Sequence, residues 1–235
     1  MAENQRIVEN EEVNEAVEKA RDFWAKFSKP IIYVGSALIL LIGGWYAYLN
    51  FVKAPNNEKA AELIFPAEQV FDKMTQGGFN KDSINLVLNG GGPVTTGVLK
   101  LINNYGGTAA GNRAHYIAGA CYLYSGDFNN AVKHLKDFST NATQVQTSAY
   151  LLLADAYSEL KKNDDALDYY KKAVAVNSKD EFMTPEALFK AGLFADATGK
   201  SKEATDFFKR IKEEFPKNGH ANEVDKYLAR LGVTE

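Results

Sequence analysis

The chain is poor in the residues that most often carry chemistry. Its 235 residues include one cysteine and three histidines, which excludes an internal disulfide and a cysteine-rich metal site. His115, His134 and His220 lack the H-x-x-x-H or H-E-x-x-H spacing of helical metal ligands. We expect His115 on a repeated helix and the other two histidines on the surface. Cys121 stands in an apolar helical run, where a small buried side chain is the expected role.

An excess of positive charge is also lacking. Lysine and arginine number 27 against 30 acidic residues, a net charge of −3, so that the chain as a whole has no excess positive charge for neutralising nucleic-acid phosphates. The glycine-rich stretches 89–97 and 106–111 follow helical segments rather than strands, and Asn112 replaces the lysine of a phosphate-binding loop. We interpret both stretches as turns that use glycine for positive φ. The sequence therefore predicts no nucleic-acid binding, no enzyme and no cofactor.

One long apolar run is present. No charged side chain occurs from Pro30 to Val52, and about 23 helical residues reach roughly 34 Å, enough to cross a hydrocarbon core of about 30 Å. We predict a single transmembrane helix over 30–52. A cleaved signal peptide is disfavoured by the long acidic segment 1–29 ahead of it. Nearby basic residues favour a cytoplasmic N-terminus and an exported C-terminal domain: Lys19, Arg21, Lys26 and Lys29 precede the run, and Lys53 and Lys59 follow it.

The flanks and one face of this helix add three expectations. Residues 1–29 form an amphipathic tail, which either lies on the membrane surface, docks a partner helix or merely leads into the span. Residues 53–57 are expected to break the helix and act as a linker. One side of the span carries small residues that permit close approach of another helix, and we predict this membrane partner face at Ser36, Leu40, Gly43 and Ala47.

Three later segments repeat one pattern. They begin at Arg113, Ser148 and Glu186 and align without gaps at offsets of 35 and 38 residues. Two amphipathic helices with a period near 34 residues are typical of tetratricopeptide repeats, which these segments resemble. Small residues stand where the two helices of a hairpin cross, at Gly119, Ala154 and Gly192. The packed positions of the second helices are Ala131, Leu135, Ala166, Tyr170, Ala204 and Phe208.

The remaining positions complete the predicted fold class. Gly126 and Gly199 end first helices where a left-handed residue is favoured, although Lys161 occupies that place in the second repeat. Pro66 is expected to kink or divide a helix. We predict an all-α fold, with one transmembrane helix followed by a solenoid. It has a degenerate repeat or cap at 58–111 and, at 112–235, three clear repeats with a C-terminal capping helix.

Stacked repeats bind ligands on a concave surface lined by their first helices. The family's usual groove positions fall on an aromatic and aliphatic set with scattered acids, without the lysine and asparagine pattern that clamps a peptide's C-terminal carboxylate. Some of these residues belong to the core instead if the cap folds into the groove. The predicted protein-binding groove comprises Arg113, Tyr116, Ala120, Leu123, Tyr124, Leu151, Asp155, Glu159, Phe189, Leu193 and Asp196.

The order of tail, anchor and solenoid, together with NYGGTAAGNRAHYIAGACYLYSGDFNNAVKHL, resembles the YfgM-like family of ancillary SecYEG translocon subunits, in its Bacteroidetes form. This resemblance implies a bacterial inner membrane and a periplasmic domain. It also implies SecYEG, a PpiD-like chaperone and emerging polypeptides as partners of a non-catalytic scaffold. Three alternatives stay open: a scaffold for cell-envelope or outer-membrane assembly or secretion machinery, a eukaryotic organelle receptor with cytosolic repeats, and a hydrolase or transferase subunit whose site lies within 58–111.

Overall fold

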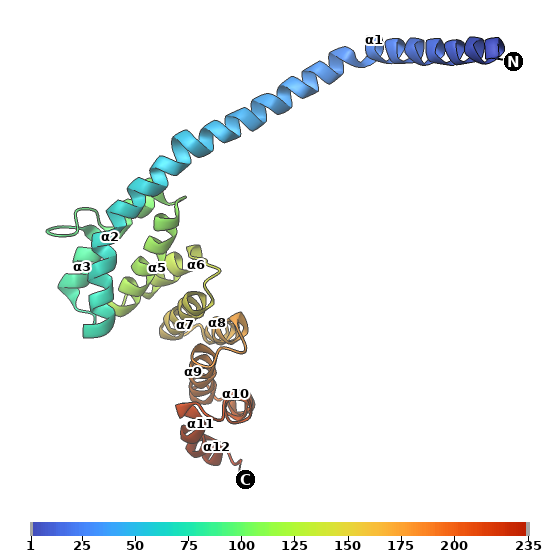
Figure 1. Ribbon diagram of the computed structural model, residues 1–235. Helices are drawn as coiled ribbons and strands as arrows, with labels where there is room; N and C mark the ends of the chain where they lie inside the picture. Colours follow the sequence, from blue (N-terminus) through green and yellow to red (C-terminus); the bar gives the residue numbers. More distant parts are fainter. Residues whose placement is uncertain (1, 234–235) are drawn as a thin grey trace. The chain divides into compact units, whose positions relative to one another are not determined.

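The fold is all-α, as the sequence predicts. The computed structural model describes residues 2–233, where helices alternate with turns and the only β-type contact is an isolated bridge between Gly91 and Val94 (Figure 1). The chain divides into two compact units, Met1–Pro55 and Asn56–Glu235.

The first unit contains an exposed apolar helix. Helix α1 spans Ala2–Tyr48 and is followed by a five-residue π-helix, Leu49–Lys53. Large apolar side chains of both helices are exposed, including Leu40 of α1 at 75% and Phe51 of the π-helix at 80%. Within the described residues this is the one helix long and apolar enough to cross a membrane, and its apolar window is not buried. A helix that is apolar on every side needs apolar surroundings.

The expected break at 53–57 is wrong as secondary structure. Helix α2, Ala54–Gly77, begins within it, directly after the π-helix. Pro55 lacks an N–H, and a proline ring clashes with the preceding turn of an ordinary helix. Here that turn is widened, because the Ala54 N–H donates to the Leu49 carbonyl five residues back. Pro66 likewise lies inside α2 and does not divide it.

The second unit opens with four helices around one core. After α2 come α3 (Lys81–Asn89), α4 (Val98–Tyr105) and α5 (Ala109–Tyr124). Asn80 caps α3 by accepting a hydrogen bond from the Ser83 N–H at 2.9 Å. The fully buried side chains of this core come from all four helices and include Ile64, Val87, Leu101 and Ala114. Residues 58–111 therefore pack as one apolar body on the first repeat.

The two glycine-rich turns are built differently. Gly90, Gly91 and Gly92 have φ values of 85°, 134° and 45°, which confirms the expected use of positive φ there. The second turn was wrongly expected to do the same, because Gly106 has a φ of −55°. Thr108 makes that turn instead: its hydroxyl donates to the Tyr105 carbonyl at 2.7 Å and accepts from the Gly111 N–H at 3.0 Å.

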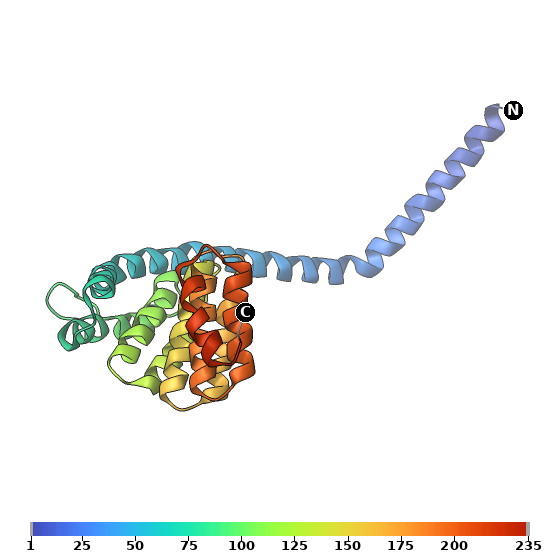
Figure 2. The ribbon, with the colours of Figure 1, turned by 90° about the horizontal axis from the view of Figure 1, so that it is seen from below.

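Three helical hairpins and two closing helices follow. The hairpins are α5 with α6 (Phe128–Asp137), α7 (Thr143–Glu159) with α8 (Asn163–Val176), and α9 (Met183–Ala197) with α10 (Ser201–Glu214). They succeed one another from green to red in Figures 1 and 2. The predicted capping helix is two short helices, α11 (Gly219–Glu223) and α12 (Asp225–Arg230).

The small residues at the hairpin crossings are confirmed as points of close approach. A Cβ atom added to Gly119 would lie 2.4 Å from Leu135 Cγ, and one added to Gly192 would lie 2.4 Å from Phe208 Cε1. Ala154, at the equivalent place, is fully buried. Each second helix thus inserts a large side chain against a small residue of the first helix, which fixes how each hairpin packs.

The left-handed positions yield a stability prediction. Gly126, Lys161 and Gly199 have φ values of 84°, 58° and 77°, and a side chain is strained in this region. Lys161→Gly should therefore raise the free energy of unfolding by about 1 kcal/mol, measured by urea unfolding. Lys162, at φ −90°, is the matched control, because glycine there only adds backbone freedom in the unfolded chain. Equal loss of stability in both variants would contradict the prediction.

Candidate functional site

A hollow on the inner side of the repeats brings several predicted groove residues together. Its volume is about 240 Å³, smaller than the roughly 300–1,000 Å³ of small-molecule pockets. First helices α5, α7 and α9 form one part of it and residues of the cap form another. Its lining residues are Phe71, Thr75, Phe79, Tyr116, Ala120, Tyr124, Ser148, Leu151, Leu152, Glu186 and Lys190. We call it the aromatic hollow.

Aromatic rings from the cap and from α5 form one wall. Phe79 and Tyr124 stack with ring centroids 3.9 Å apart, and Phe71 meets Tyr116 edge-on at 6.2 Å. Tyr124 nevertheless remains 54% exposed. Offset and edge-on arrangements of this kind hold rings in place while leaving apolar area accessible. The hollow therefore offers a rigid apolar surface to a further side chain.

Two of these rings were not predicted as site residues. Phe71 belongs to the buried apolar face of α2, and Phe79 follows the glycine pair at the end of that helix. Arg113 Nε lies 2.6 Å from Glu68 Oε1 on α2, so that this predicted groove position is tied to the cap. Folding of the cap onto the first repeat explains both results. The apolar face of α2 is visible in the sequence, but residue spacing does not show which surface that face packs against.

A second hollow adjoins the first and has acidic character. It encloses about 490 Å³ and includes predicted residues Leu123, Tyr124, Asp155 and Glu159, with Tyr124 shared between the hollows. Glu159 is exposed. Asp155 accepts hydrogen bonds from the Tyr170 hydroxyl at 2.5 Å and from Lys190 Nζ at 3.0 Å. We call this the acidic hollow.

Tyr170 keeps its proton in this setting. Burial, followed by the adjacent Asp155 carboxylate, raises the pKa of the Tyr170 phenol well above its ordinary value. The hydroxyl therefore acts as a permanent donor that orients Asp155. This is a structural role, in which one carboxylate is held facing the acidic hollow between a hydroxyl and an ammonium group.

The third repeat contributes its predicted residues elsewhere. Phe189 stacks on His220, with centroids 4.2 Å apart, and meets Tyr227 edge-on at 5.7 Å. Asp196 forms an ion pair with Arg230, and Leu193 packs against the C-terminal core. These three positions do not line either hollow, because the closing helices cover them, as terminal caps of a solenoid do.

His134 is buried, and its expected surface position is wrong. It is 8% exposed, its Nδ1 lies 3.2 Å from Nδ1 of His115, and Tyr122 stacks on its ring. The two histidines are 19 residues apart but lie on the facing helices α5 and α6. His220, with its side chain 25% exposed, contacts Glu186 at 2.9 Å. In the described part of the chain no three or more His, Cys, Asp or Glu side chains are grouped to hold a metal ion.

The histidine pair predicts a pH dependence of stability. Burial lowers the pKa of both His115 and His134 from 6.5, with Lys133 acting in the same direction and Asp137 opposing. The unfolded chain therefore takes up protons first as the pH falls. The free energy of unfolding should therefore keep its full value above pH 6.5 and fall as the pH is lowered below it. Urea unfolding across that pH range measures this change. Replacing both His115 and His134 with glutamine should reduce this dependence of the free energy of unfolding on pH, whereas the control His220→Gln should leave it in place. An unchanged pH dependence in the double variant would contradict the prediction.

Cys121 is confirmed as a small buried side chain. It is fully buried, and burial raises the pKa of its thiol to about 12. Thiolate is the reactive form of cysteine. The folded protein therefore offers no nucleophilic sulfur at this position.

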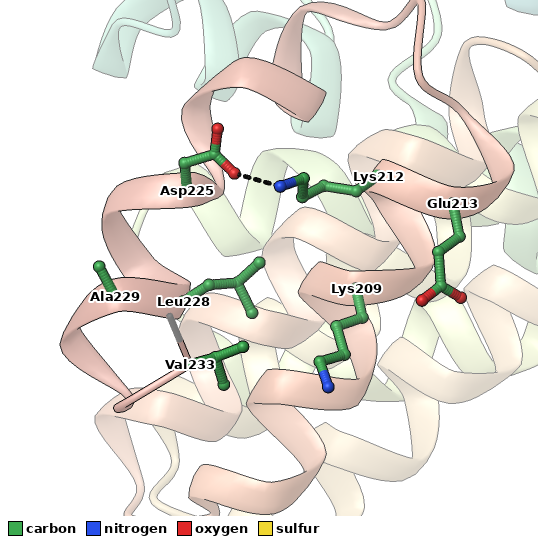
Figure 3. Close-up of a pocket in the computed structure, with 7 residues that line it drawn as sticks. All are labelled: Lys209, Lys212, Glu213, Asp225, Leu228, Ala229 and Val233. Carbon is green, nitrogen blue, oxygen red and sulfur yellow. Dashed lines mark ion pairs between the residues drawn. The ribbon is translucent and has the colours of Figure 1, made fainter. Parts of the chain in front are cut away.

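A larger hollow lies between α10 and α12 and has mixed character. It encloses about 560 Å³ and is lined by Lys209, Lys212, Glu213, Asp225, Leu228, Ala229 and Val233. Figure 3 shows Leu228 and Val233 side by side below an ion pair that joins the two helices, Lys212 Nζ to Asp225 Oδ1 at 2.8 Å. None of the predicted site residues lines it. The Lys212–Asp225 pair links α10 to α12 across this hollow.

Comparison with known protein families gives one match. The model described as "Tetratricopeptide repeat-like domain" matches residues 21–224. This range takes in the exposed apolar helix as well as the cap and all three hairpins. No curated protein matches the chain.

Proposed function

Because the chain belongs to the tetratricopeptide repeat-like domain family, we propose that it is a non-catalytic scaffold, anchored in a membrane by α1, that holds segments of other polypeptides. The family supports protein–protein interaction as the general role. The exposed apolar helix supports anchorage. Among the described residues there is no metal-binding cluster, and the proposal does not depend on this absence.

The aromatic hollow is the observation that carries the proposal. A hollow of about 240 Å³ suits a side chain rather than a metabolite. Tyr124 stands between it and the acidic hollow and is half exposed. Exposed, rigid aromatic rings are the usual anchors of protein interfaces. The occupant we propose is an extended segment with a large apolar residue in the aromatic hollow and a lysine or arginine near Glu159.

The finer proposal concerns the membrane complex. The distribution of basic residues around the apolar run supports an N-terminus in the cytoplasm and exported repeats. Resemblance to the YfgM-like family supports a bacterial inner membrane, with the repeats in the periplasm. The same resemblance supports a position beside the SecYEG translocon, with a PpiD-like chaperone and emerging polypeptides as partners. Protease digestion of intact spheroplasts tests the topology, since periplasmic repeats would be cleaved and cytoplasmic ones protected.

Site-specific crosslinking in living cells tests the partners. A photoreactive amino acid at Tyr124 should capture exported polypeptides or a periplasmic folding factor, and one at Gly43 should capture a channel subunit. Phe182, 78% exposed and outside both hollows, is the control position. If outer-membrane assembly or secretion components were captured at Tyr124 instead, the protein would be a scaffold for that machinery and not a translocon subunit. If the same crosslinked proteins were obtained at Tyr124 and at Phe182, the aromatic hollow would not be the binding site.

A substitution in the shared wall tests the hollow itself. Tyr124→Ala should weaken binding of the partner captured there by about thirtyfold or more, because truncating a central interface tyrosine costs about 2 kcal/mol or more. Phe182→Ala is the matched control on an equally accessible ring. The measurement is retention of the purified partner on immobilised full-length protein in mild detergent. Unchanged retention by Tyr124→Ala would contradict the proposed site.

A further inference from the structure

An exposed aromatic stripe lies on α1 just ahead of the apolar run. Phe23 and Trp24 are adjacent on α1, and Phe27 follows them four and three residues later; the three side chains are 56%, 57% and 40% exposed. Phe23 and Phe27 contact each other, with ring centroids 4.9 Å apart. Residues at this spacing share one face of a helix. The stripe is therefore a continuous apolar surface without a protein covering in the described residues.

Basic side chains surround the stripe. Between residues 19 and 29 there are four of them, Lys19, Arg21, Lys26 and Lys29, against Asp22 as the one acid. Lys26 Nζ lies over the Phe27 ring, 5.5 Å from its centroid. Amphipathic segments with aromatic residues on one side and lysine or arginine beside them lie in the interfacial region of bilayers. The local positive charge complements anionic headgroups, although the more distal tail is acidic.

The spacing along α1 fits two membrane interfaces. Trp24 and Trp45 are separated by about 32 Å of helix at 1.5 Å per residue, close to the roughly 30 Å of a hydrocarbon core. Tyr46 and Tyr48 stand beside Trp45, and tryptophan and tyrosine prefer the headgroup level at both ends of a span. One ring cluster therefore falls at each end of the apolar run.

Pro30 lies between the stripe and the apolar run, inside α1. A proline in a helix interior removes one backbone hydrogen bond and permits a kink. Both views show α1 changing direction along its length (Figure 1, Figure 2). A kink at Pro30 would allow Lys26 and Lys29 to stay among the headgroups while the following residues enter the hydrocarbon.

We propose that residues 21–29 form an interfacial segment, with Phe23, Trp24 and Phe27 inserted below the headgroups and Arg21, Lys26 and Lys29 on the phosphates of anionic lipids. This inference rests on the proposed anchorage by α1. It adds a lipid class and the residues that recognise it. The family match begins at residue 21 and so includes the segment.

The two tryptophans of the chain make the test direct. Trp45→Phe leaves Trp24 as the single tryptophan, and Trp24→Phe leaves Trp45. Each full-length variant is reconstituted into nanodiscs of phosphatidylcholine with or without phosphatidylglycerol. Its emission is then quenched by lipids brominated near the headgroup, by lipids brominated near the chain end, or by aqueous iodide.

We expect Trp24 to be quenched more by the shallow bromines than by the deep ones. In discs with phosphatidylglycerol it should also shift its emission to the blue and lose accessibility to iodide. Trp45 should be quenched by brominated lipid in both compositions. Quenching of Trp24 by iodide alone, with Trp45 quenched by lipid, overturns the inference and leaves the anchor intact. Protection of Trp24 from both quenchers also overturns it, because a protein would then cover the stripe. Failure of lipid to quench either tryptophan removes the anchor itself.

Discussion

Replacing Phe208 with alanine is expected to lower the free energy of unfolding by about 3–5 kcal/mol, the range for truncating a buried phenylalanine. The ring is fully buried and stacks on Tyr227 with centroids 5.2 Å apart. Its edge fills the space left by the missing side chain of Gly192. A cavity at this crossing would therefore loosen the third hairpin and the closing helices together. Urea unfolding of the detergent-solubilised full chain, followed by circular dichroism, measures the effect.

Phe182→Ala provides the matched control for this large effect. Phe182 is 78% exposed, so its truncation should change stability by no more than about 0.5 kcal/mol. A reciprocal variant sharpens the test further. Gly192→Ala should destabilise the native chain, because its Cβ would lie 2.4 Å from the Phe208 ring. The same change should become neutral or stabilising once residue 208 is alanine; additive effects would refute the close-crossing explanation.

Gly111→Ala is the second substitution with a large expected effect, about 2–4 kcal/mol of lost stability. A Cβ atom at Gly111 would lie 2.2 Å from the Tyr105 carbonyl oxygen and 2.7 Å from Gly106 Cα. These are backbone atoms, which cannot rotate away as a side chain can. The turn between α4 and α5 would have to open, and Thr108 would lose its bond to the Gly111 N–H.

Gly107→Ala is the control for Gly111→Ala. It lies in the same turn, has no heavy atom within 4 Å of its added Cβ, and does not have positive φ. We expect a change within about 0.5 kcal/mol. Thermal unfolding of the two variants side by side measures the contrast. If both variants were equally stable, close packing at Gly111 would not be the reason for a glycine there.

The repeat architecture could be predicted because it depends on local spacing. Aligned small residues such as Gly119 and Gly192 predicted where helices cross, and the structure confirms both contacts. The wrongly expected break at 53–57 has a local cause as well. Pro55 normally disfavours a helix, and only the π-type turn immediately before it makes a helical path possible. Widened turns of this kind have no reliable sequence signature.

The candidate site could be predicted only in part. Tyr116, Tyr124 and Leu151 share the aromatic hollow because they occupy equivalent faces of first helices. Phe71 joins them from a helix more than 40 residues away in sequence, through a tertiary contact that periodicity does not specify. The closing helices partly cover Phe189 through contacts of the same kind, which periodicity does not specify either. Burial of His134 likewise depends on its pairing with His115 across a hairpin.

The seclusion of Cys121 bears on where such a chain can mature. Its sulfur is buried among apolar neighbours and stays protonated, so that the folded chain presents no reactive thiol to a thiol oxidoreductase. Crosslinked dimers through this thiol can arise only before the core closes. The same seclusion makes the natural sequence a clean background for spin labels or fluorophores, since any cysteine placed on its exterior becomes the sole site of attachment.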